Sequence, residues 1–141
     1  MNTNKKYFKV FKAADVNSTK QRTYRKYAEG GAYEDVPADY IIIGDNISGT
    51  GIKDKSQAGN NVIRVNFGIL GDENAVYYRG TLNLTEEGLN AMRAGESQPE
   101  GQRSAVFGTM STKDKVEVDV AGWVVKAADS GKLYINCQMG E

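Results

Sequence analysis

Two neighbouring segments of this chain alternate apolar and polar side chains, and this alternation restricts the fold more than any other feature. Between residues 62 and 70, the odd-numbered positions carry Ile, Val, Phe and Ile, with Arg64 and Asn66 between them. Residues 75–84 repeat the pattern. A period of two places successive side chains on opposite faces of a β-strand. Because only a Gly-Asp-Glu-Asn turn separates the two segments, the sequence predicts an antiparallel hairpin with one apolar face.

Further elements are expected on both sides of this hairpin. The other predicted strands are 5–12, 40–47, 104–110, 115–126 and 132–139. One helix is predicted near 85–94, because Thr85 can cap its free N–H groups, two glutamates suit its positive end and Gly95 can end it. Polar and glycine-rich stretches at 13–39 and 49–61 predict loops, with one short element near 21–28.

The order of these elements predicts a mostly β fold, a β-barrel with one short α-helix. A five-stranded Greek-key barrel of the OB type has a helix between its third and fourth strands. Within residues 40–141, three predicted strands precede the helix and others follow it. We therefore expect an OB-like Greek-key domain over residues 40–141. Residues 1–39 are expected to form a basic arm and loop region that packs on this domain or extends from it.

Size and composition favour one domain in the cytoplasm. The chain has 141 residues, of which 40% are apolar and 26% charged, and this is enough to build one core. No apolar run is long enough to cross a membrane, and the first ten residues lack the apolar part of a secretory signal. The single cysteine, Cys137, makes no internal disulfide, which fits a reducing compartment. We expect no membrane partner.

The residue types that most enzymes need are sparse. The chain has no histidine, the commonest general base and metal ligand, and one cysteine cannot build a zinc site of Cys and His ligands. No phosphate-binding glycine loop and no Gly-x-Ser-x-Gly motif occurs. Glu117 and Asp119 share one strand face and are able to orient a cation, but alternating acids more often protect a strand edge. We expect a binding protein without metal or cofactor, not an enzyme.

Positive charge is concentrated near the N-terminus, although the net charge of the whole chain is zero. Residues 1–26 hold eight basic side chains and one acid, so the remainder is acidic. Such a segment can contact a polyanion, because Lys and Arg that neutralise phosphates release counterions. It can equally lie against the acidic remainder of its own chain or of a second copy. The charge pattern alone leaves both interpretations open.

One face of the predicted sheet combines aromatic and basic side chains. The outward positions of the central and last hairpins carry Arg64, Tyr77, Arg79, Trp123 and Tyr134. Exposed aromatic rings stack on bases and guanidinium groups meet phosphates, which is what a binder of single strands needs. A bulge at Gly122 would instead turn Trp123 back into the core. Lys53 and Lys55 lie in a predicted loop, where OB folds close over their ligand.

The last hairpin also resembles a known family. Its sequence AGWVVK followed by SGKLYI, within residues 121–135, resembles a G-W-x-x-K … G-K-x-Y-[IL] hairpin of small single-stranded-DNA-binding, OB-like proteins of phages and mobile elements. The matching positions are Trp123, Lys126, Lys132 and Tyr134. The resemblance implies binding of single-stranded DNA during replication or recombination.

The sequence thus predicts a protein that binds single-stranded DNA. The predicted contact residues are Trp123, Tyr134, Tyr77, Arg79, Arg64, Lys53, Lys55, Lys126, Lys132, Arg22, Arg25 and Lys26. The alternative is a non-enzymatic interaction or structural protein, such as a phage assembly or host-takeover factor. A basic segment joined to an acidic body also suits assembly of a homo-oligomer by arm exchange.

Overall fold

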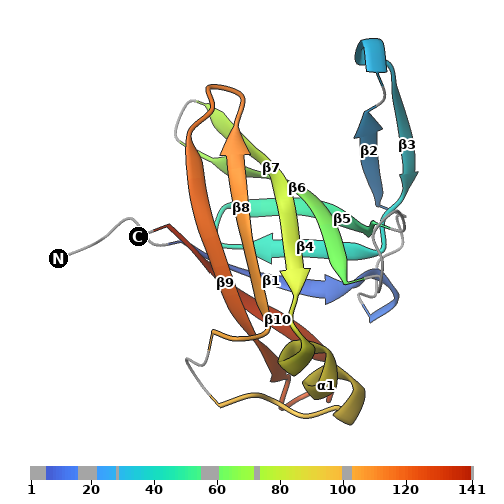
Figure 1. The fold of residues 1–141 in the computed structure, drawn as a ribbon, viewed down its shortest axis with the longest axis vertical. Coiled ribbons are helices and arrows are strands. Elements are labelled where there is room, and N and C mark those ends of the chain that lie inside the picture. Colours follow the sequence, from blue (N-terminus) through green and yellow to red (C-terminus); the bar gives the residue numbers. More distant parts are fainter. Residues whose placement is uncertain are drawn as a thin grey trace, which may run out of the picture.

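Eight antiparallel strands close into a barrel in the computed structural model, which describes residues 6–15, 22–27, 29–54, 61–71, 74–99 and 103–140 (Figure 1). The barrel strands are β1 (Lys6–Lys12), β4 (Tyr40–Gly44), β5 (Ile47–Lys53), β6 (Val62–Leu70), β7 (Ala75–Leu84), β8 (Val106–Thr112), β9 (Glu117–Lys126) and β10 (Leu133–Met139). Outside it lie a hairpin of β2 (Thr23–Tyr27) and β3 (Tyr33–Pro37), the helix α1 (Glu86–Ala94) and the short 3-10 turns Ala13–Asp15 and Glu29–Gly31.

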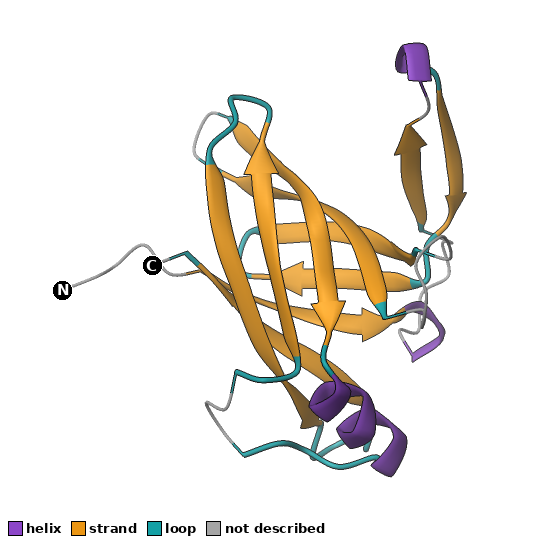
Figure 2. Ribbon diagram, viewed as in Figure 1, coloured by secondary structure: helices purple, strands orange, loops and turns teal. Residues whose placement is uncertain are grey.

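The strand order is a simple meander. Strands β4 to β10 follow one another around the ring in chain order, and β1 closes it between β10 and β4. The prediction of a mostly β barrel with one short helix is confirmed (Figure 2). The expected OB-type Greek key differs from what is observed, which is eight strands without a crossover. The difference arises because β5 was not predicted as a strand and because β1, which was assigned to the arm, belongs to the barrel. Strand β3, which was also not predicted, lies outside the barrel.

A tight turn divides the predicted strand 40–47 into two. Asp45 and Asn46 form the turn, and Asn46 adopts a φ of 57°, a left-handed conformation that Asn tolerates better than most residues. The chain then returns as β5, where a loop was predicted. Gly49 of β5 pairs with Phe67, and a Cβ added at Gly49 would lie 2.4 Å from the Cβ of Phe67. The glycine that resembled a loop signal is therefore what lets a large ring fit inside the barrel.

The first described strand is part of the barrel wall. β1 pairs with β10 on one side and with β4 on the other. Its inward side chains, Phe8 and Val10, are buried, while Tyr7, Lys9 and Phe11 alternate with them on the outer surface. The structure therefore differs from the expected division at residue 39, because removing β1 would leave β4 and β10 with unpaired edges.

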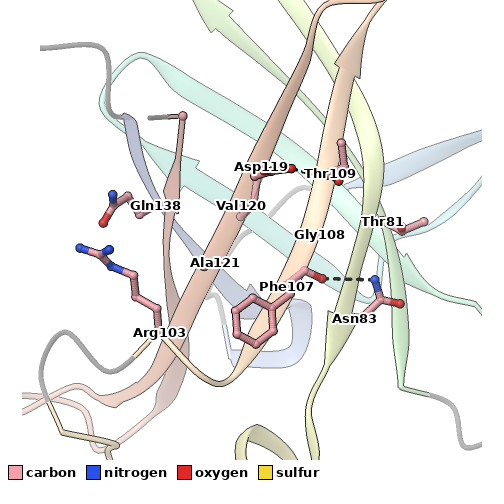
Figure 3. Close-up of a pocket in the computed structure, with 11 residues that line it drawn as sticks. Thr81, Asn83, Arg103, Phe107, Gly108, Thr109, Asp119, Val120, Ala121 and Gln138 are labelled. Atoms are coloured by element: carbon pink, nitrogen blue, oxygen red, sulfur yellow. Dashed lines mark hydrogen bonds between the residues drawn. The ribbon is translucent and has the colours of Figure 1, made fainter. Parts of the chain in front are cut away.

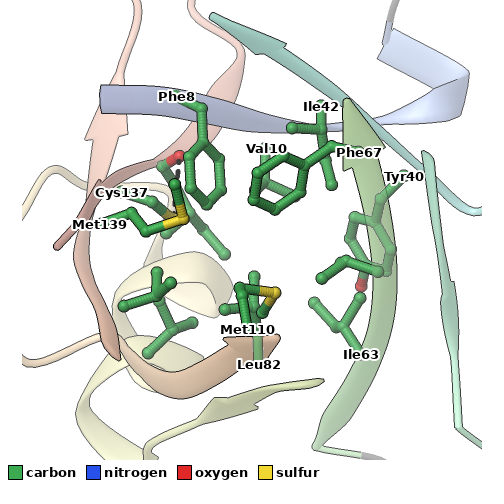
Figure 4. Packing of buried hydrophobic residues seen from close by; sticks show 14 of the residues in the cluster. Phe8, Val10, Tyr40, Ile42, Ile63, Phe67, Leu82, Met110, Cys137 and Met139 are labelled. Carbon is green, nitrogen blue, oxygen red and sulfur yellow. Dashed lines mark hydrogen bonds between the residues drawn. The ribbon is translucent and has the colours of Figure 1, made fainter. Parts of the chain in front are cut away.

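The core fills the barrel interior. The Phe67 ring lies between Phe8 and Tyr78, with centroid distances of 5.0 and 5.6 Å (Figure 4 shows the Phe8–Phe67 pair). The interior also contains fully buried Met110 and Cys137. Burial raises the pKa of the Cys137 thiol far above its ordinary value. Cys137 therefore serves as a small apolar core side chain, as its register predicts.

The predicted helix forms between the residues expected to start and end it. The hydroxyl of Thr85 accepts a hydrogen bond from the Gly88 amide at 3.0 Å, and Gly95 ends the helix at a φ of 69°. Leu89 and Met92 pack on the core, so α1 covers one end of the barrel (Figure 1). No helix in the described part of the chain is long and apolar enough to cross a membrane.

Candidate nucleic-acid interface

The β2–β3 hairpin is fastened to the barrel wall at its base. Tyr24 of β2 is buried, and the Thr50 hydroxyl of β5 donates a hydrogen bond to the Thr23 carbonyl at 2.9 Å. Burial raises the pKa of Tyr24, and the neighbouring positive charges of Arg79 and Arg64 partly oppose that rise. The hairpin thus brings β2 close to basic side chains on the outer face of β6 and β7.

A groove of about 760 Å³ separates the hairpin from the barrel wall. Three basic side chains from different elements line it: Arg25 of β2, Arg79 of β7 and Lys113, which follows β8. Tyr77 lines the same groove. Its lining, among the residues that the structure describes, includes no carboxylate. The groove is therefore a positively charged concavity with an aromatic side chain in its wall.

Arg25 is held in position on the hairpin. Its guanidinium carbon lies 4.0 Å from the centre of the Tyr33 ring, and its Nε donates to Asp35 at 3.2 Å. These two contacts come from β3, directly across the hairpin from β2. These contacts fix the guanidinium of Arg25 on the hairpin side of the groove.

Tyr77 presents a flat ring to the solvent. It is 71% exposed and lies opposite Gly68 in the β6–β7 pairing. A Cβ on Gly68 would come within 2.9 Å of the Tyr77 ring, so the ring rests across the glycine. Arg79 follows two residues later on the same outward face. The arrangement provides an open aromatic surface beside a guanidinium group, which suits stacking of an unpaired base.

Arg64 lies on the same outer face as the groove, but its guanidinium group forms an ion pair with Asp54. Its Nε donates to the carboxylate of Asp54 at 2.8 Å, and Asp54 is buried. This hydrogen bond raises the pKa of Arg64 further above its ordinary value. Arg64 therefore satisfies a buried carboxylate and contributes less to a phosphate contact than the sequence suggested.

The predicted contact residues divide into two groups that the barrel keeps apart. Tyr77, Arg79 and Arg25 meet at the groove. Trp123, Tyr134, Lys126 and Lys132 lie on or beside β9 and β10. Tyr77 and Arg79 lie on β7, which is two positions from β9 and three from β10 around the ring of eight, and the β9–β10 residues do not line the groove.

Trp123 points outward, as its register predicts, but is only 9% exposed. It pairs with Asn136 in an unbroken β9–β10 ladder, so Gly122 introduces no bulge there. The segment after α1 runs along this edge of β9, where the amide of Gln98 donates to the Val124 carbonyl at 2.8 Å. The sequence left open whether Trp123 is an exposed platform or a covered side chain. In the structure it is nearly covered, because a segment distant in the chain packs alongside β9.

Tyr134 is also occupied by neighbours within the chain. The Phe11 ring lies 5.1 Å from it, and the Lys9 ammonium group lies 5.0 Å from its ring centre. Lys126 and Lys132 are exposed near the end of that hairpin. This side of the barrel therefore offers packed aromatic rings and scattered lysines, and Trp123 and Tyr134 line a depression of about 310 Å³ beside Gln98.

The remaining predicted residues surround the hairpin base. Arg22 and Lys26 are exposed on the hairpin, and Lys53 is exposed at the end of β5. Lys55 lies outside the described residues. Sequence reasoning missed Lys113 and the strand β3. A signal for β3 existed, because Gly30 and Gly31, with φ of 80° and 85°, separate two short β-prone stretches.

Comparisons with family models, with curated proteins and with solved structures find no match to this chain. Among the residues that the structure describes, no cluster of three or more His, Cys, Asp or Glu side chains is placed to hold a metal ion. A functional proposal therefore rests on the groove and its surroundings.

Proposed function

We propose that this protein binds single-stranded nucleic acid, specifically DNA, in the groove between the β2–β3 hairpin and the barrel, as a non-enzymatic protein of the cytoplasm. One observation carries the proposal. Three basic side chains and an open aromatic ring converge on one concavity whose described lining contains no carboxylate. Basic groups there neutralise phosphates, while the ring of Tyr77 takes an unpaired base.

A single strand fits this site better than a duplex does. Stacking on Tyr77 requires the face of a base, and in a duplex the faces are covered by the neighbouring base pairs of the stack. Tyr77 and Arg79 are two residues apart on one strand face, so a base and a neighbouring phosphate can be engaged together. The hairpin carries Arg25 on the opposite wall, so the backbone of a strand would be contacted from both sides.

The resemblance of residues 121–135 supports DNA as the nucleic acid and phage-type replication or recombination as the process. In this proposal Trp123 and Tyr134 of that hairpin contribute to packing, because Trp123 is nearly covered and Tyr134 contacts Phe11 and Lys9. Base stacking is assigned to Tyr77.

Fluorescence anisotropy with labelled single-stranded and duplex oligonucleotides tests the proposal. We expect tighter binding of the single strand, weakened by added salt. Tyr77→Ala should reduce affinity by about 1–3 kcal/mol, the usual contribution of one stacked base. Tyr7→Ala is the matched control, because Tyr7 is also exposed but lies on β1, away from the groove. Absence of single-strand binding at low salt would refute the proposal.

One observation favours the alternative of a protein contact. Tyr7 of β1 and Ile43 of β4 are exposed large apolar side chains that line one shallow, mainly apolar depression. Such a patch suits contact with another protein chain, including a second copy. Multi-angle light scattering of the wild type and of Ile43→Lys distinguishes this candidate. An oligomer that the substitution dissociates would support it, and a wild-type monomer would exclude self-association.

A further inference from the structure

A second depression lies on the outer face of β7 to β10, with a volume of about 530 Å³ (Figure 3). Thr81 and Asn83 of β7 and Thr109 of β8 form part of its lining. Its lining is mixed polar and apolar, with one large aromatic side chain, Phe107, and one basic side chain, Arg103. Neither residue belongs to the groove.

The depression continues the groove along the same two strands. Three consecutive outward pairs connect β7 and β8: Arg79 with Ser111, Thr81 with Thr109, and Asn83 with Phe107. The first pair lines the groove and the other two line the depression. A ligand that leaves the groove along β7 and β8 therefore enters the depression without crossing another element of the described chain.

The side chains of the depression suit an unpaired base. Phe107 is 51% exposed, so one face of its ring is available for stacking. Gln138 of β10 lines the depression and is only 7% exposed. A side-chain amide donates and accepts hydrogen bonds, as the edges of bases do. Gln138 therefore offers the depression a group that suits the edge of a base.

The charged side chains of the depression determine how a nucleic-acid strand would be oriented in it. Asp119 accepts a hydrogen bond from the Thr109 hydroxyl at 3.3 Å, midway along the β8–β9 pairing. The carboxylate of Asp119 repels phosphates, so the bases of a bound nucleic acid, rather than its phosphates, would face this part of the depression. Arg103 is exposed at the lining of the depression and can meet a phosphate there.

From this geometry we propose that the depression is a second subsite for the same single strand, in which Phe107 stacks an unpaired base, the Gln138 amide meets its edge and Arg103 contacts a phosphate. The inference rests on the proposed function of the groove. Tyr77 and Asn83, which pairs with Phe107, are six residues apart on β7, a separation of about 20 Å. The ligand is therefore an oligonucleotide several residues long rather than a mononucleotide.

The test compares short and long labelled oligothymidylates, of roughly 4 and 12 nucleotides, within the usual range of single-strand site sizes. Phe107→Ala should weaken binding of the long strand by about 5- to 150-fold, because one stacked base is lost, and should leave the short strand in the groove unaffected. For the long strand, Arg103→Gln should lower the slope of log affinity against log salt by about one, the effect of losing one phosphate contact. Tyr77→Ala should weaken the binding of both oligonucleotides, the short and the long.

The possible outcomes are distinguishable. If Phe107→Ala and Arg103→Gln bind the long strand as the wild type does, while Tyr77→Ala loses affinity, the groove stands and the second subsite is overturned. If no oligonucleotide binds the wild type, both proposals fail. Thermal unfolding controls for folding, and because Arg103 is exposed, Arg103→Gln keeps the test valid should Phe107→Ala be unstable. Tyr7→Ala controls for loss of an exposed aromatic ring elsewhere.

Discussion

The ring of Tyr77 lies across Gly68, and a Cβ at Gly68 would come within 2.9 Å of it. Gly68→Ala should therefore displace the ring while leaving the chemistry of every lining side chain unchanged. We expect affinity for a single-stranded oligonucleotide to fall toward that of Tyr77→Ala. Folding stability should change little, because the displaced ring is exposed at the surface. Anisotropy and thermal unfolding measure the two effects. Wild-type affinity in Gly68→Ala would show that the orientation of the ring does not matter.

Lys113 should contribute to binding through charge alone. It lines the groove near Arg79, so Lys113→Gln should lower the slope of log affinity against log salt by about one, with a uniform loss across sequences. Lys126→Gln is the matched control, since Lys126 is an exposed lysine on β9 outside the groove. A larger effect at Lys126 than at Lys113 would place the ligand on the β9–β10 side of the barrel.

Trp123 should behave as a packed side chain. Because it is only 9% exposed, its emission should be blue-shifted in the free protein and should not be quenched by single-stranded DNA bound in the groove. Trp123→Ala should lower the free energy of unfolding by about 3–5 kcal/mol, the usual cost of truncating a buried aromatic residue. Steady-state fluorescence and chemical denaturation measure both. Strong quenching by DNA would contradict the assignment of stacking to Tyr77.

Removing residues 1–12 should abolish the cooperative folding of the barrel. The deletion takes away β1, whose Phe8 and Val10 are buried and which closes the ring between β4 and β10. Thermal unfolding followed by circular dichroism should lose its sharp transition. The double substitution Lys9→Gln and Lys12→Gln is the control, since it removes charge and retains the strand. A deletion variant as stable as the wild type would show that this segment is dispensable.

Gly49 should be far less tolerant of a side chain than its neighbour. A Cβ at Gly49 would lie 2.1 Å from the Asn66 carbonyl oxygen and 2.4 Å from the Phe67 Cβ. Gly49→Ala should destabilise the protein by about 1–3 kcal/mol, the usual cost of overpacking a core. Ser48→Ala is the control, because Ser48 is exposed on the same strand. Equal denaturation midpoints for the two variants would contradict the tight fit.

Features that depend on near neighbours in the chain could be predicted from the sequence. Strands β6 and β7 follow directly from their alternation, because side chains on a strand change faces at every residue. The helix follows from Thr85 and Gly95, whose capping interactions act within one turn. The inward register of Cys137 and the outward register of Tyr77 were predictable for the same reason.

Features that depend on contacts between distant segments were decided by the tertiary structure. Closure of the barrel by β1, and with it eight strands in place of five, requires pairing with β4 and β10 far along the chain. The covering of Trp123 depends on the segment after α1, which pairs beside it through Gln98. Arg25 and Tyr77 meet only because Tyr24 fastens the hairpin to the barrel wall. A local pattern determines which way a side chain points, whereas what packs against that side chain depends on how the ring closes.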